Sequence, residues 1–229
     1  DEDRRALIDA VLSDIGVPES DAGGVFPASI HEASSAAFRT RRPVCHIVAG
    51  ANGSGKSTFA LHFLPHYAAC IAFVNPDLIA GGISPFDPTL AAVKSGRLVL
   101  ERIAELTAEG RDFGFETTLS GRGYLAQLQA LREAGFALHL YYLWTEGCDL
   151  LIPRIRQRVL AGGHHVPDQD VRRRYERSLK NIADYAVIMD KIRVFDNSGP
   201  TPVLVYEKSG DVRVYDEKRF GRMGGGLHV

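Results

Sequence analysis

The sequence predicts an α/β fold, a three-layer sandwich in which helices cover both faces of a mainly parallel central sheet. Short apolar runs alternate along the chain with segments of helical periodicity, which is the order expected for parallel strands connected by helices. One run, FALHLYYLW, is too apolar for a sheet edge and therefore suits a central strand. The 229 residues are enough to bury a single core. Ligands of such a fold should lie at the carboxyl ends of the strands.

The chain divides into an N-terminal segment, residues 1–40, and a main domain, residues 41–229. Residues 3–16 predict an amphipathic helix, because their apolar side chains recur at helical spacing: Leu7, Ile8, Val11, Leu12 and Ile15. Residues 17–40 are rich in Gly, Pro, Ser and Ala, which predicts a flexible connection. This segment is a candidate regulatory element, although a helix that simply covers the core fits the same pattern.

Strands and helices alternate through the main domain. The strands are expected in the run 44–48 and in the runs CIAFVN, RDFGFETTL, FALHLYYLW and IRVFDN. Helices are expected from Lys56 to about Leu64, over residues 88–109, in GYLAQLQALREAG, and in the Arg-rich stretch from Pro153 to about Asp190. The stretch PVLVYEKSGDVRVY predicts a C-terminal β-hairpin that turns at Ser209 and Gly210.

A glycine-rich loop, AGANGSGKST, joins the first expected strand to the first helix. It matches G-x-x-x-x-G-K-[ST] in full and in the required context, so an incidental Gly-Ser turn is a poor alternative. Converging backbone N–H groups and the helix N-terminus would hold phosphates there, Lys56 would bridge the outer oxygens, and Ser57 would ligate Mg²⁺. The sequence thus predicts an ATP and Mg²⁺ site built from Gly50, Asn52, Gly53, Ser54, Gly55, Lys56, Ser57 and Thr58.

Charge and composition limit the partners. With 27 Lys and Arg against 28 Asp and Glu, the net charge of −1 provides no global field for nucleic acid or an anionic membrane, and we expect neither partner. No apolar run approaches the roughly 20 residues of a membrane span. The three cysteines are widely spaced, and the first residues, DEDRRALIDA, are too charged for a secretory signal. These features favour a cytoplasmic protein.

The usual parts of a nucleotide hydrolase are missing. TLSGRG resembles the signature of transporter ATPases, but the next strand ends in Thr145 rather than in an Asp-Glu pair. The guanine-binding motif N-K-x-D does not occur either. A small-molecule kinase therefore remains the favoured class, with a nucleotide-dependent switch that has no acceptor as the alternative.

Polar residues at the ends of two further strands predict where an acceptor binds. Asp77, in VNPD, could take the proton of an attacking hydroxyl, although a cap of the next helix is the better interpretation of this residue taken alone. Glu116, Thr117 and Thr118 close the strand FGFETT and could orient a sugar, although an ordinary strand end is as good an interpretation. We include Arg122, four residues further on, among the expected acceptor-binding residues.

Arginines in the stretch after the fourth strand suit a lid over ATP. Arg154 and Arg158 share a helix face, and Arg172 to Arg174 follow the Gly-hinged segment LAGGHHVPDQD. We expect Arg154, Arg158 and Arg172 at the nucleotide, with Arg158 stabilising the transferring phosphoryl group. A solvated helix face is the plainer alternative. His164 and His165 have no metal-ligand spacing and should be loop residues.

These motifs together resemble the zeta-toxin family of P-loop kinases over about residues 44–197. The resemblance implies a P-loop kinase-like sandwich with an Arg-rich helical lid, in a cytosolic protein of bacterial toxin–antitoxin type. It implies transfer of the γ-phosphate of ATP to the 3′-hydroxyl of UDP-N-acetylglucosamine. The family's P-loop lysine falls on Lys56, its catalytic base on Asp77 and its substrate-contacting residues on Glu116, Thr117 and Thr118.

The resemblance leaves some points open. Arg158 is favoured as a lid arginine together with one of Arg172 to Arg174. Some relatives act instead on the adenosine ribose of NAD, so a nucleotide sugar or a dinucleotide could be the substrate. The resemblance also implies restraint by an antitoxin protein or by a self-inhibitory segment, a role that residues 1–40 could fill. A nucleic-acid end kinase is disfavoured by the near-neutral charge.

Overall fold

The computed structural model describes residues 41–163, 165–224 and 227. The helix predicted over residues 3–16, with the rest of the candidate regulatory segment, lies outside the described residues. Among the described helices, none is both long and apolar enough to cross a membrane.

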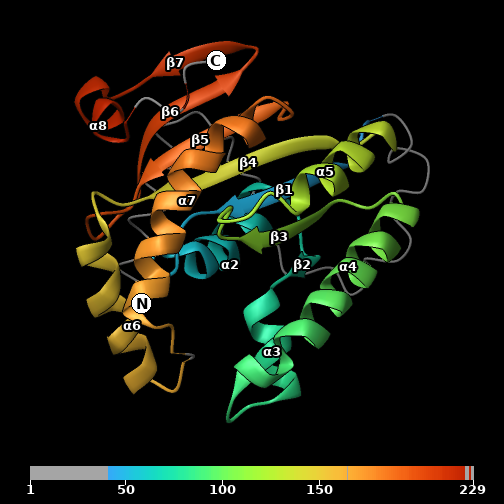
Figure 1. The fold of residues 1–229 in the computed structure, drawn as a ribbon. Coiled ribbons are helices and arrows are strands. Elements are labelled where there is room, and N and C mark those ends of the chain that lie inside the picture. The colour runs from blue at the N-terminus through green and yellow to red at the C-terminus, as the bar shows by residue number, and fades with distance from the viewer. Residues whose placement is uncertain (1–40, 164, 225–226, 228–229) are drawn as a thin grey trace.

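A seven-stranded sheet in the order β2-β3-β1-β4-β5-β6-β7 forms the middle layer of the described residues (Figure 1). Strands β1 to β5 pair in parallel, while β6 pairs antiparallel with β5 and β7. The predicted mainly parallel sheet and C-terminal hairpin are confirmed. The strands are β1 (Val44–Ala49), β2 (Phe73–Val74), β3 (Phe113–Thr117), β4 (Ala137–Trp144), β5 (Lys191–Asp196), β6 (Val203–Ser209) and β7 (Asp211–Val214).

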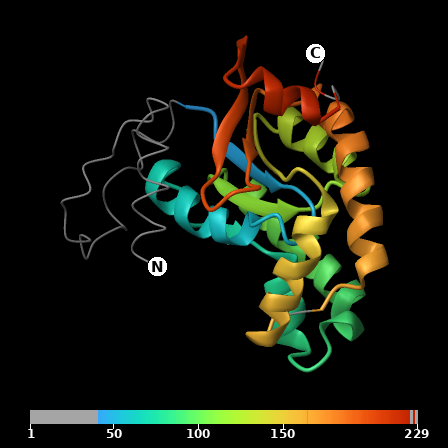
Figure 2. The same cartoon turned by 90° about the vertical axis from the view of Figure 1, so that its left-hand side faces the viewer.

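Helices cover both faces of this sheet (Figure 2). Phe59 and Phe63 of α2 pack on one face, and α4, α5 and α7 contribute to the larger cluster on the other. The helices are α2 (Lys56–Tyr67), α3 (Pro76–Ile83), α4 (Ala92–Ala108), α5 (Tyr124–Glu133), α6 (Leu151–Leu160), α7 (Asp168–Ala186) and α8 (Glu217–Arg222), with 3₁₀ turns η2 (Pro88–Ala91) and η3 (Cys148–Leu150).

Three predicted elements differ in extent from the structure. The strand β2 is only two residues long, shorter than the run CIAFVN predicts, because it gives way at Asn75 to the cap of α3. The helix predicted over residues 88–109 begins with the turn η2. The Arg-rich stretch is divided into α6 and α7, because Gly162 adopts a φ of 86° at the end of α6 and breaks the helix there.

Toward the amino ends of the strands, the sheet face under α2 carries polar side chains. His46, His139 and Arg193 each lie two residues before a member of the apolar cluster that packs against α2. Arg193 is paired with Glu207 at 2.7 Å. Burial lowers the pKa of His46 to about 4, with the neighbouring His139 adding to the effect. Burial, and then the charge of Lys191, lowers the pKa of His139 to about 4 as well.

Candidate active site

The glycine-rich loop lies against the carboxyl end of β4. Gly50 has a φ of 140°, and a Cβ there would come within 2.3 Å of the Leu143 carbonyl oxygen. Gly55, with a φ of 90°, is the N-cap residue of α2, and a Cβ there would lie 2.5 Å from the Asn197 amide nitrogen. Glycine at both positions lets the loop curl tightly between β1 and α2, so that its backbone N–H groups can converge on an anion.

Glu116, at the end of β3, contacts the last two residues of the phosphate-loop motif. Its Oε2 accepts a hydrogen bond from Ser57 Oγ at 2.7 Å, and its Oε1 lies 3.6 Å from Lys56 Nζ. Lys56 also donates to the Ala51 carbonyl at 2.9 Å, which folds its side chain back over the loop. The Lys56 and Glu116 side chains are 5% and 8% exposed, so the pair is shielded from solvent. The predicted phosphate loop and the predicted acceptor strand therefore meet in one cluster.

Asn75 connects this cluster to α3. Its Nδ2 donates to Glu116 Oε2 at 3.0 Å, while its Oδ1 accepts from the backbone N–H groups of Asp77 and Leu78 at 2.9 and 3.2 Å. Asn75 is therefore the cap of α3, and the carboxylate of Asp77 is not used for capping. Asp77 lies exposed in the first turn of the helix.

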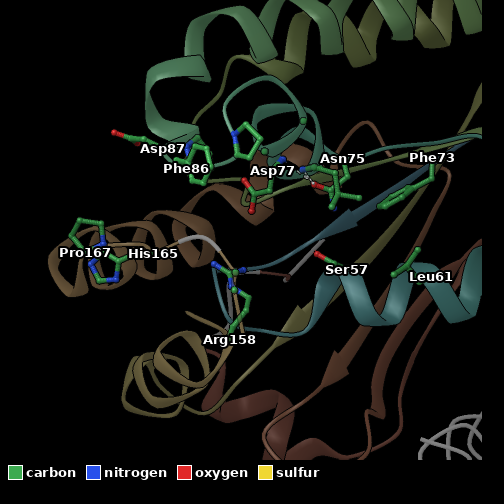
Figure 3. Close-up of a pocket in the computed structure, with 17 residues that line it drawn as sticks. Ser57, Leu61, Phe73, Asn75, Asp77, Phe86, Asp87, Arg158, His165 and Pro167 are labelled. Carbon is green, nitrogen blue, oxygen red and sulfur yellow. Dashed lines mark hydrogen bonds between the residues drawn. The ribbon is translucent and has the colours of Figure 1, made fainter. Parts of the chain in front are cut away.

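A cleft of about 1020 Å³ opens beside these side chains. Figure 3 shows Asp77 and Phe86 on the wall formed by α3 and the loop after it, with Arg158, His165 and Pro167 on the opposite wall and Ser57 on α2. The residues that line the cleft are Ser57, Leu61, Phe73, Asn75, Asp77, Leu78, Gly81, Gly82, Pro85, Phe86, Asp87, Pro88, Arg158, Gly162, Gly163, His165 and Pro167. The expected base and the expected lid arginine thus face one cavity next to the phosphate loop.

Arg158 is held at the cleft by the loop that follows its helix. The Gly163 N–H donates to the Arg158 carbonyl at 2.9 Å, and a Cβ on Gly163 would lie 2.6 Å from Arg158 Cγ. A glycine is therefore needed where this loop folds back on the end of α6. The arginine side chain occupies the space that a larger residue would fill.

The other predicted lid arginines occupy different places. Arg154 donates to the carbonyls of Asn197 and Ser198, both at 2.9 Å, and Asn197 donates in turn to the Ser54 carbonyl at 2.7 Å. Arg154 thus lies beside the phosphate loop, on the segment that follows β5. Arg172 points elsewhere, to Asp149 at 3.0 Å.

Arg174, one of the three neighbouring candidates, reaches the phosphate loop. Its Nη1 donates to the Asn52 side-chain oxygen at 3.1 Å. Consecutive residues of a helix point about 100° apart, so only one of Arg172 to Arg174 can face the loop in this way. The orientation of α7 therefore brings Arg174 to the phosphate loop.

The remaining acceptor candidates lie in the segment after β3 and are absent from the cleft lining. Thr117 accepts a hydrogen bond from the Leu119 N–H at 3.2 Å, and Thr118 pairs with Ser120 at 2.8 Å. Arg122 forms an ion pair with Asp184 at 2.6 Å. The Thr117 and Thr118 hydroxyls thus shape the turn in this conformation, and Arg122 ties the segment to α7.

The helix α7 holds this segment by two further hydrogen bonds. Asn181 donates to the Leu119 carbonyl at 2.9 Å, and the Tyr185 hydroxyl donates to the Gly121 carbonyl at 2.7 Å. Leu119 has a φ of 51°, a left-handed conformation that is unfavourable for leucine and has to be held in place. Because Arg174 is on the same helix, α7 contacts both the phosphate loop and the segment behind Glu116.

The oxygen donors near the phosphate loop suit Mg²⁺. No group of three or more His, Cys, Asp and Glu side chains in the described parts of the chain could hold a metal ion by itself. Mg²⁺ is commonly bound through one or two protein oxygens together with nucleotide phosphates. The Ser57 hydroxyl and the Glu116 carboxylate, 2.7 Å apart, are a donor pair of that kind.

The structure adds residues that the sequence analysis does not predict. Asn75 is one of them, although an Asn directly before Pro is a strong signal for a helix cap. Asn197 and Asn181 carried no signal, because their roles depend on which segments the fold brings together. The sequence analysis predicts Arg172 at the nucleotide, whereas in the structure it is Arg174 that contacts the phosphate loop.

The phosphate loop, its partners and the parallel sheet define a protein of the P-loop kinase type. The profile of the zeta toxin family matches residues 28–219, and the chain therefore belongs to the zeta toxin family. Family and fold together support a kinase-type function and a phosphotransferase reaction.

One relative and two solved structures are similar to this chain. An uncharacterised protein of Haemophilus influenzae is 32% identical over 126 residues, which are 55% of this chain and 88% of that protein. A chain of the AvrRxo1-ORF1:ORF2 crystal structure with ATP has a TM-score of 0.67 at 16% identity, over 83% of this chain and 66% of that chain. A structure of the PezAT toxin–antitoxin system of Streptococcus pneumoniae has a TM-score of 0.59 at 14% identity, over 81% and 85%. At identities this low, the two structural similarities show a shared fold alone.

Proposed function

We propose that this protein is a Mg²⁺- and ATP-dependent kinase that transfers the γ-phosphate to a hydroxyl of a nucleotide sugar, with the 3′-hydroxyl of UDP-N-acetylglucosamine as the favoured acceptor. The observation that carries the proposal is the position of Asp77. Its carboxylate faces the same cleft as Ser57 and Arg158, while Asn75 supplies the helix cap that Asp77 would otherwise have provided. Because Asp77 does not cap the helix and lies beside the phosphate loop, its carboxylate can act as a base.

The donor binds through the glycine-rich loop. Its phosphates accept hydrogen bonds from the loop N–H groups and from Lys56, which leaves its contact with the Ala51 carbonyl to reach them. Ser57 and Glu116 would hold Mg²⁺, which neutralises charge on the β- and γ-phosphates when bound. Arg154 and the segment after β5 lie beside Ser54 of the loop, and we expect them to border the bound nucleotide.

In the transfer step, the acceptor oxygen attacks the γ-phosphorus while Asp77 takes its proton. The bond between the γ-phosphorus and the bridging oxygen breaks, its electron pair stays on that oxygen, and ADP leaves. Arg158, at the cleft, and Lys56 stabilise the charge on the transferring group. Arg174 orients the loop through Asn52.

There are two alternatives to this proposed function. The same chemistry could act on the ribose of NAD, because the residues named above contact the hydroxyl and the γ-phosphate rather than the rest of the acceptor. A nucleotide-dependent switch without an acceptor is the second alternative. In such a switch, Asp77 would have no role in turnover.

A direct test incubates the protein with Mg²⁺-ATP and a panel of UDP-sugars, NAD and aminosugars, and detects the gain of one phosphate by mass spectrometry. The matched pair is Asp77→Asn, which keeps the shape and loses the base, and Asp87→Asn, which changes another carboxylate of the same cleft. A kinase should lose about 10²- to 10⁴-fold in kcat with Asp77→Asn alone and keep its affinity for ATP. Equal turnover in all three proteins would contradict the proposal.

We also propose restraint by an antitoxin or by residues 1–40, in a cytoplasmic setting. The PezAT structure comes from a toxin–antitoxin system, and the AvrRxo1 structure is a complex of two proteins. Deletion of residues 1–40 should raise kinase activity if the segment is inhibitory. Unchanged or lower activity would leave a separate protein as the restraint.

A further inference from the structure

The cleft is larger than the chemistry proposed for it requires. Its volume of about 1020 Å³ is at the upper limit of the roughly 300–1,000 Å³ typical of sites for drug-sized ligands. Ser57, Asp77 and Arg158 account for the reacting hydroxyl and the γ-phosphate. The part of the cleft beyond Asp77, toward the loop after α3, has no role in that step.

This outer part is lined mainly by apolar and proline side chains. Phe86, Pro85 and Pro88 come from the loop after α3 and the start of η2, and Pro167 comes from the α6–α7 connection. Figure 3 shows Phe86 on one wall and Pro167, with His165, on the other. The two walls come from segments far apart in the chain, and a flat ligand could lie between them.

Phe86 is the most exposed large apolar side chain of the described residues, at 103% of its reference area. Leu78, on the α3 wall of the cleft, is 66% exposed. Isolated apolar side chains at a surface need no explanation, but two on the same wall of one cleft form an apolar surface of the kind that binds ligands. An aromatic ring offers a flat face on which another ring can stack.

Charge contributes little to recognition in this outer part. Of the charged side chains that line the cleft, Asp77 and Arg158 are assigned to the reacting groups, which leaves Asp87 in the outer part. Affinity for the outer part of an acceptor should therefore come from apolar contact and stacking. Free hexoses and small polyols have no group that would use this surface.

We propose that the outer part of the cleft is a subsite for a nucleobase of the acceptor and that Phe86 is the residue on which this base stacks. This inference rests on the proposed function, because it assumes that the cleft takes the acceptor. The ligand chemistry is a nucleoside attached through phosphate to the group that carries the reacting hydroxyl. Uracil of a UDP-sugar and a base of a dinucleotide are two sources of that chemistry.

The test compares acceptors with and without a base on matched variants. Phe86→Ala removes the ring, Phe86→Trp keeps an aromatic face, and Leu90→Ala removes another exposed side chain, 81% exposed, that does not line the cleft. The acceptors are UDP-N-acetylglucosamine, NAD and the base-free N-acetylglucosamine 1-phosphate. For each pair, kcat and KM are measured separately at saturating Mg²⁺-ATP.

Phe86→Ala should raise KM about 10-fold for the acceptor that carries a base, as expected for loss of stacking between a base and an aromatic ring, with kcat unchanged. Phe86→Trp and Leu90→Ala should behave like the wild type. KM for the base-free acceptor should be the same in wild type and Phe86→Ala. If Phe86→Ala leaves KM for the base-carrying acceptor unchanged, or raises KM equally for the base-free acceptor, the proposed subsite is overturned. Whichever of UDP-N-acetylglucosamine and NAD responds identifies the source of the base.

Failure of the proposed function is recognised separately. If the wild type phosphorylates no acceptor, the subsite is judged by calorimetric titration of UDP-N-acetylglucosamine and of NAD in the presence of a non-hydrolysable ATP analogue. Binding to the wild type that weakens about 10-fold in Phe86→Ala would support the subsite without the reaction. Absence of binding to the wild type, or equal binding to both proteins, would overturn it.

Discussion

Replacement of Glu116 separates the structural and chemical roles of the cluster around the phosphate loop. Glu116→Gln keeps an oxygen for the hydrogen bonds from Ser57 and Asn75, at 2.7 and 3.0 Å, but loses the charge that strengthens both. It also brings an amide toward Lys56, whose Nζ is 3.6 Å from the other oxygen. Glu116→Ala removes all three contacts and leaves the buried Lys56 and Asn75 without this partner.

The expected magnitudes follow from these contacts. A hydrogen bond to a charged partner is worth about 1 kcal/mol more than a neutral one, so Glu116→Gln should lower the free energy of unfolding by about 2 kcal/mol. Loss of one partner of a buried ion pair costs about 3–5 kcal/mol, which sets the expectation for Glu116→Ala. For a domain of this size, the melting temperature should fall by about 4–8 °C in the first variant and about 6–20 °C in the second.

Thermal unfolding, followed by circular dichroism with and without Mg²⁺-ATP, measures both roles. Glu101→Gln, at an exposed position of α4, is the matched control and should melt within about 2 °C of the wild type. Glu116→Gln should also lose most of the stabilisation that Mg²⁺-ATP gives the wild type, because it removes an oxygen proposed to hold the metal. If Glu116→Ala melts within about 2 °C of the wild type, the cluster does not contribute to stability and the reasoning is refuted.

Three further predictions concern α7 and the polar side chains under α2. Arg174→Ala should raise KM for ATP about 10-fold, since it removes a charged contact with the phosphate loop, whereas Arg172→Ala should change it less than about twofold; equal effects in ATP titrations would contradict the helical phase described above. Asn181→Leu removes the hydrogen bond that supports the left-handed Leu119 and should lower the free energy of unfolding, measured by urea denaturation, by about 1–3 kcal/mol. An unchanged free energy of unfolding would show that this hydrogen bond does not contribute to stability. The pKa values of His46 and His139, lowered to about 4 by burial, predict that stability is complete above pH 6.5 and falls between about pH 6.5 and 4, because the unfolded chain then binds protons that the native chain does not. Urea denaturation at several pH values should show a smaller slope in His46→Gln, and an unchanged slope would exclude this residue as a source.

The phosphate loop and the parallel sheet could be predicted because their signals are local. The motif fixes the loop from its own residues, and continuous apolar runs such as β4 identify strands that are buried on both faces. The position of Asp77 at the site also followed, because parallel strands bring their carboxyl ends to one edge.

The partners of these residues could not be predicted, because they depend on helical phase and on long-range pairing. Three consecutive arginines cannot be ranked until the orientation of α7 is known. Asn75 and Glu116 are separated by 41 residues, and only the pairing of β2 with β3 brings them together. Phe86 looks in the sequence like part of a loop, and its significance comes from the cleft beside it.

The double contact of Asn75 has a consequence for how such a protein can change its substrate. Asn75 ties the start of α3 to Glu116, and the parallel pairing of Val74 with Phe115 fixes the register of the two strand ends. The wall that contains Phe86 lies between this fixed point and α4, on a stretch whose length neither strand constrains. The proposed base, Asp77, and the proposed metal ligand, Glu116, both depend on this fixed point, whereas the proposed stacking residue Phe86 does not. If both proposals hold, the loop around Phe86 is where a change of sequence would alter the acceptor without moving the reacting groups.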